Sequence, residues 1–158
     1  MPRLLAFLPC DNVLISGGVA QSASLIVIYS QVVFPPGLPP DLPPKAVAPL
    51  RWYIFTQWEI DESEVGIEYQ QRVHMDGFDG TRLLESHLSF TGETGKPIHR
   101  TMIGNAGFPI VPSGRYRLKL SIKAADDNEW TEAGDYPLNV MHAPAPEHES
   151  GETVVGAQ

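Results

Sequence analysis

Hydrophobic and polar residues alternate most regularly between Arg115 and Lys123. The apolar positions are Tyr116, Leu118, Leu120 and Ile122, and the positions between them are Arg115, Arg117, Lys119, Ser121 and Lys123. A period of two is typical of a β-strand with one buried face and one face in water. Such a strand needs antiparallel neighbours and a second layer over its apolar face. This stretch therefore predicts a two-layer, all-β domain.

Similar patterns predict seven further strands, at residues 3–9, 25–34, 51–60, 65–75, 82–91, 97–103 and 136–141. Large side chains on both faces of 51–60 indicate a central strand, with Trp52 and Trp58 in the core. The run 25–34 is apolar on both faces, which leaves open whether it is one strand or a strand interrupted by a helical turn. Pro137 lacks an amide hydrogen, so the last strand is expected either to lie at a sheet edge or to have Pro137 at its start.

The strands 65–75 and 82–91 are expected to form an antiparallel hairpin, because Asp79-Gly80 is a typical turn sequence. Pairing Met75 with Arg82 would place Arg72 opposite Glu85, and these two residues are predicted to form an ion pair. The same register keeps His74 and His87 too far apart to share a metal ion. Both histidines are therefore interpreted as separate surface residues.

The chain of 158 residues is long enough for one domain with its own core. We expect a β-sandwich over residues 1–141 with about seven or eight antiparallel strands. Its proline-rich segment, Pro35 to Pro49, is expected to run over the surface as an internal connection. Residues 142–158 form a Pro- and Glu-rich C-terminal tail, whose composition is typical of a segment without a core of its own.

The net charge of −8 makes nucleic acid and anionic membrane surfaces poor partners. The row Arg115, Arg117 and Lys119 is interpreted as a solubilising strand face. Cys10 is the only cysteine, so no disulfide within the chain is expected, and its simplest interpretation is a small buried residue. The apolar run from Leu4 to Leu8 is shorter than a signal core, and no run is long enough to span a membrane, which predicts a soluble protein.

Several landmarks, in this order, resemble a family of small bacterial proteins that contain a domain of unknown function. They are Leu8-Pro9-Cys10-Asp11, the apolar stretch Leu25 to Phe34, the proline-rich connection, Asp79-Gly80, Gly114 to Leu120, and Pro137 to Val140. The resemblance covers about residues 3–141. It implies an immunoglobulin-like β-sandwich and a bacterial or phage-derived, cytoplasmic protein, and it implies no activity.

No nucleophile motif, phosphate-binding loop or zinc motif is present in the sequence, so we expect a protein that is not an enzyme and has no cofactor. If each strand crosses the sandwich once, several acidic loops lie at the same end of the sandwich. Asp11 and Glu93 are expected at this end as well. The main candidates for a Ca²⁺ site there are Asp61, Glu62, Glu64, Asp126, Asp127 and Glu129. The simpler interpretation is that these residues are soluble acidic turns.

Trp130 is surrounded by polar residues in the sequence, and we expect it to be partly exposed and to contact a partner. The tail is expected to add a strand to a neighbouring copy through Glu152, Thr153, Val154 and Val155. The leading hypothesis is thus a non-catalytic β-sandwich that acts through protein contacts, including self-assembly into a homo-oligomer. The alternative is a module that binds Ca²⁺ or carbohydrate at the acidic end near Trp130.

Overall fold

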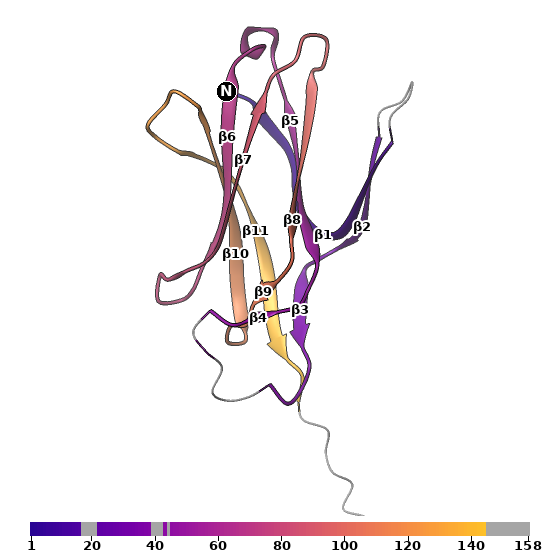
Figure 1. Cartoon of the computed structure of the whole chain (residues 1–158), viewed down its shortest axis with the longest axis vertical. Helices are drawn as coiled ribbons and strands as arrows, with labels where there is room; N and C mark the ends of the chain where they lie inside the picture. The colour runs from indigo at the N-terminus through magenta and orange to yellow at the C-terminus, as the bar shows by residue number, and fades with distance from the viewer. Residues whose placement is uncertain (17–21, 39–42, 44, 145–158) are drawn as a thin grey trace, which may run out of the picture.

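The computed structural model describes residues 1–16, 22–38, 43 and 45–144, and in these residues the regular secondary structure is β-strand apart from one 3₁₀ turn (Figure 1). The strands are β1 (Arg3–Ser16), β2 (Ser22–Ile28), β3 (Gln31–Phe34), β4 (Val47–Ala48), β5 (Trp52–Glu59), β6 (Glu68–Asp76), β7 (Arg82–Thr91), β8 (Ile98–Asn105), β9 (Phe108–Pro109), β10 (Gly114–Ala124) and β11 (Thr131–His142). A 3₁₀ turn, Glu62–Glu64, joins β5 to β6. The predicted all-β sandwich is confirmed.

Two main sheets form the layers. One has the order β2-β1-β5-β8 and the other the order β3-β11-β10-β6-β7, while β4 and β9 form a small ribbon. Neighbouring strands are antiparallel, except that β3 runs parallel to β11. The strand β5 has a partner on each side, as its apolar residues predicted.

The core lies between the sheets and is built from alternate residues of the facing strands. Trp52 and Trp58 of β5 are 1% and 0% exposed, which confirms their predicted place in the core. From the opposite sheet, Val73, Leu118 and Leu120 are completely buried. Alternation along β6 and β10 thus turns one face inward, as the sequence indicated.

The run 25–34 is neither of the two arrangements left open by the sequence. It splits into β2 and β3, which belong to different sheets, and the chain passes between the sheets at Tyr29 and Ser30. Val27 has a φ of 50°, which is costly for a β-branched residue. In this run only Val32 and Phe34 of β3 are buried, whereas Ile26, Val27 and Ile28 of β2 are exposed, so burial does not explain the apolar character of the β2 half.

The hairpin of β6 and β7 exists, but its predicted register was wrong. A bulge between Met75 and Asp76 places Asp76 opposite Arg82 and Arg72 opposite His87. The predicted pair between Arg72 and Glu85 is therefore absent, and the carboxylate of Glu85 instead contacts Arg82 and His87.

His74 also differs from its prediction as a surface residue. It is only 8% exposed, and its Nδ1 has no hydrogen-bond partner among the described residues. Burial lowers the pKa of His74, and the nearby Arg82 guanidinium lowers it further.

Pro137 lies inside β11, which has a neighbour on each side, so the prediction of an edge strand was wrong for the strand as a whole. The missing amide hydrogen of Pro137 is nevertheless compatible with the local strand pairing. The short strand β3 pairs only with residues 139–142 of β11, and the amide of Asn139 donates to Ser30. Amide directions alternate along a strand, so an amide at residue 137 would point to the same side as the amide of Asn139. Strand β3 does not extend as far as residue 137, so the proline leaves no hydrogen bond unmade there.

Candidate functional site

One hairpin leaves the body of the sandwich (Figure 1). The strand β1 pairs with β5 through residues 3–10 and with β2 through residues 10–16. Its second half and β2 therefore form a two-stranded extension, residues 10–16 and 22–28, which we call the arm. The first strand was predicted to end at Pro9, and the arm was not predicted.

The inner side of the arm packs on the outside of the four-stranded sheet. Cys10, Val13 and Phe55 are 0%, 8% and 3% exposed and form a hydrophobic cluster separate from the main core. Burial raises the pKa of the Cys10 thiol, and the charge of Asp11 raises it further. Cys10 therefore matches its simplest interpretation, a buried apolar side chain.

The arm carries several exposed apolar side chains. Leu14 is 55% exposed, and Ile26, Val27 and Ile28 of β2 are 39%, 61% and 47% exposed. In the described part of the chain β2 pairs only with β1, so its second edge presents open backbone donors and acceptors. Asp11 is the only charged residue of the arm, and its carboxylate accepts a hydrogen bond from Tyr29.

The structure brings only some of the predicted acidic residues close together. Asp61, Glu62 and Glu64 lie around the 3₁₀ turn, and Asp61 and Glu64 form a capping box there. Glu93 pairs with Lys96. Asp11 lies within β1 and not in a loop, because the first strand continues past it.

The second acidic group, Asp126, Asp127 and Glu129, is exposed in the loop between β10 and β11. Nowhere in the described residues do three or more His, Cys, Asp or Glu side chains gather closely enough to hold a metal ion. The Ca²⁺ site therefore stays a prediction, and this part of the chain contains no preformed site for it. Glu64 is also buried, so its carboxylate belongs to the turn.

Trp130 is half-buried, as predicted, but positive side chains surround it. The guanidinium carbon of Arg72 lies 4.5 Å from the centre of the indole, and Nζ of Lys123 lies 5.4 Å from it. His87 meets the ring edge-on at 5.9 Å. These are cation–π distances, and the positive charges disfavour a Ca²⁺ ion beside the indole.

An apolar hollow of about 350 Å³ lies beside the edge strand β3. Its lining includes Val33, Leu38, Val47, Leu50 and Ile110, so the proline-rich connection forms one of its walls. Val33 and Val47 are each more than half exposed. The remaining predicted contact residues, Glu152, Thr153, Val154 and Val155, lie outside the described residues.

No protein-family model matches the chain. The search of curated proteins also gives no match. The resemblance to a bacterial family therefore stays a prediction. Among solved structures, the chain is similar to CopC from Methylosinus trichosporium OB3b, with 12% identity and a TM-score of 0.38 over 92% of this chain and 98% of that chain. A likeness this weak supports no conclusion about function.

No helix in the described part of the chain is long or apolar enough to cross a membrane. The feature that the sequence analysis overlooked is the arm, although the chain does carry a signal for it. From Asn12 to Pro40 there is no Asp, Glu, Lys or Arg. This long uncharged stretch in an otherwise acidic chain includes both strands of the arm except Cys10 and Asp11.

Proposed function

We propose that this protein is a non-catalytic β-sandwich that acts through protein contacts, and that the arm is its contact with a second copy. The observation that carries the proposal is the group of exposed apolar side chains on the arm, which lies along the open edge of β2. Exposed edges of this kind readily pair with another strand. Most sheet proteins protect such an edge with charge or proline, and β2 contains neither.

A second copy is the occupant favoured by charge and symmetry. Two chains that each carry −8 repel each other, so contact is least costly where the surface has almost no charge, as on the arm. An antiparallel edge also matches itself about a twofold axis. Pairing β2 with its counterpart would join the two four-stranded sheets and cover the same apolar residues on both copies.

The proposal is tested by placing a charge on the edge strand. Ile26→Lys brings like charges together across the twofold axis and should weaken association at least tenfold. Association is measured by sedimentation velocity over a range of protein concentrations. Ile67→Lys is the matched control, because Ile67 is 40% exposed against 39% for Ile26 and lies outside the arm. It should leave association unchanged.

A wild-type chain that remains monomeric at high concentration would overturn this proposal. Equal weakening by both lysine variants would also overturn it, since that result would indicate a general effect of charge. Far-UV circular dichroism of each variant verifies that the sandwich is intact before the association constants are compared.

A further inference from the structure

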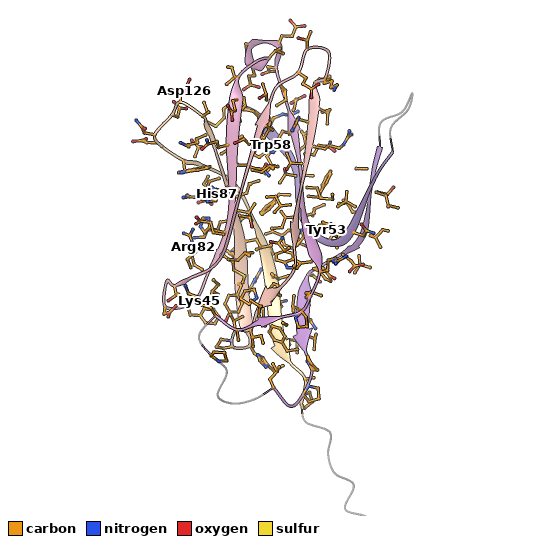
Figure 2. The ribbon with its side chains drawn as sticks, viewed as in Figure 1. Lys45, Tyr53, Trp58, Arg82, His87 and Asp126 are labelled. Atoms are coloured by element: carbon orange, nitrogen blue, oxygen red, sulfur yellow. The ribbon has the colours of Figure 1, made fainter. Side chains whose placement is uncertain are left out.

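Positive charge is concentrated on the outer face of the five-stranded sheet. Inward positions of β10 hold Leu118 and Leu120, so the intervening residues point outward, and the register places β6 and β7 alongside them. Six of the eleven Lys and Arg residues lie on this face, which we call the basic face: Arg72, Arg82, Arg115, Arg117, Lys119 and Lys123. Figure 2 shows Arg82 and His87 on this outer side.

Two of the six cations already have carboxylate partners. Arg82 pairs with Asp76 at 2.6 Å and also contacts Glu85, and Arg117 pairs with Asp135. The other four, Arg72, Arg115, Lys119 and Lys123, have no carboxylate partner among the described residues. Carboxylates share this outer face, since the register places Asp135 opposite Lys119 and Glu132 opposite Ser121, so the six cations outnumber the carboxylates by a small margin on a chain that is acidic as a whole.

Arg72 is the most strongly positioned of these cations. Its guanidinium stacks on the indole of Trp130, and its Nε is buried without a hydrogen-bond partner in the described residues. Stacking holds the guanidinium plane fixed while its outer N–H groups remain able to bind an anion in a bidentate manner. Lys123 adds a second charge at the same indole.

We propose that the basic face binds a short acidic peptide segment, with Arg72 and Trp130 as its anchor. Outward residues of β10 recur about every 6.8 Å, and alternate side chains of an extended peptide have the same repeat. Glutamates at every second position would therefore meet the cations of β10 in register. This ligand class replaces the Ca²⁺ expected near Trp130, because the groups around the indole are cations.

The extent of the basic face favours a short ligand. Acidic residues of the loop between β10 and β11 lie next to Trp130, with Asp126, Asp127 and Glu129 all exposed. A long polyanion such as nucleic acid would extend past the cations onto this acidic loop and be repelled, whereas a segment of about eight residues fits along β10.

The test uses the full chain and a fluorescent peptide of four Glu-Ser repeats, with binding measured by fluorescence anisotropy. Arg72→Gln combined with Lys123→Gln should weaken binding at least tenfold. Lys96→Gln combined with Arg100→Gln is the matched control, since it removes the same charge from outside the basic face. It should change binding less than twofold. Arg72→Lys keeps the charge but loses the planar stack, and it should give an intermediate loss.

Equal weakening by the two double variants would overturn the proposal, because only the overall charge would then matter. The absence of peptide binding at low salt would also overturn it, as would tighter binding of a ten-nucleotide single-stranded DNA or of a heparin oligosaccharide of similar charge. The single variant Lys123→Gln provides a second measurement, since that side chain is on the surface and its loss leaves the core intact. It should weaken binding by a smaller factor than the double variant.

Discussion

The indole Nε1 of Trp58 donates a hydrogen bond of 2.9 Å to Oε1 of Gln71, which links β5 to β6 across the sandwich. Thr56 donates to the same oxygen at 3.1 Å, and Nε2 of Gln71 donates to the hydroxyl of Thr101 at 2.8 Å. All four side chains are buried. A polar network of this kind fixes the relative position of two sheets, because sliding either sheet would leave buried polar groups unpaired.

Replacing Gln71 with leucine should destabilise the sandwich by about 1–3 kcal/mol, because Trp58, Thr56 and Thr101 each lose one buried hydrogen bond and keep only the bonds that Thr56 makes with Trp58 and Thr101. The change is measured by urea unfolding followed by tryptophan fluorescence. Gln70→Leu, on the outer side of the same strand, is the control and should change the free energy of unfolding by less than about 0.5 kcal/mol. Similar losses in both variants would show that the network adds no stability.

The sequence predicted that Gln71 points into the core, but it did not predict the hydrogen-bond partners of Gln71. Alternation along β6 places Gln71 on the same face as Val73 and Met75, so its inward direction follows from a period of two. Its partners are not predictable in this way, because Thr56 and Thr101 come from strands whose register depends on long-range packing. The same limit explains the error in the hairpin of β6 and β7, where the turn pairs Asp76 rather than Met75 with Arg82 and the bulge between Met75 and Asp76 shifts the remaining pairs by one more residue.

The candidate site was also predicted in part. Polar flanking residues correctly indicated that Trp130 is half-buried, but Arg72 of β6 and His87 of β7, which contact its indole, are distant in sequence. The arm was missed because a period-two pattern does not reveal when a strand leaves its sheet. Val27 illustrates the reason, since nothing about a valine in an apolar run predicts a left-handed backbone.

The stability of the fold should fall as the pH is lowered from about 7 towards 5. Burial is the main cause of the lowered pKa of both His74 and His99, while Asp76 and Glu93, respectively, act in the opposite direction. The unfolded chain therefore takes up protons first, near its ordinary histidine pKa of about 6.5, and stability is lost until the folded histidines also protonate.

This pH dependence is measured as the free energy of unfolding in urea at several pH values between 5 and 7.5. His74→Gln and His99→Phe should each reduce the slope, and the phenyl ring of the latter keeps the stacking of residue 99 on Phe90. His87→Gln, at an exposed position, is the comparison. A slope that is unchanged in both of the first two variants would refute the assignment.

The thiol of Cys10 should report opening of the arm. In the folded protein it is completely buried and its pKa is raised, so reaction with a disulfide reagent at pH 8 should be orders of magnitude slower than in urea. Val13→Ala removes about 1.5 kcal/mol of apolar contact beneath the arm and should speed labelling roughly tenfold. Val73→Ala, in the main core, should leave this local opening unchanged. Equal acceleration by both variants would show that the thiol is exposed only by global unfolding.

Deleting residues 145–158 tests the predicted contact of the tail while keeping the hydrogen bond from the Ala143 amide to Phe34 at 2.9 Å. If Glu152 to Val155 adds a strand to a neighbouring copy, the free side of β3 is a suitable acceptor, because the apolar hollow at Val33 lies beside it. The truncated chain should then lose assemblies larger than the arm-mediated dimer, as measured by light scattering. Its melting temperature should change little, because burial of two valines by the tail contributes only a few kcal/mol and ordering the tail offsets that gain. An unaltered size distribution would exclude the tail contact and leave the arm as the proposed self-association surface.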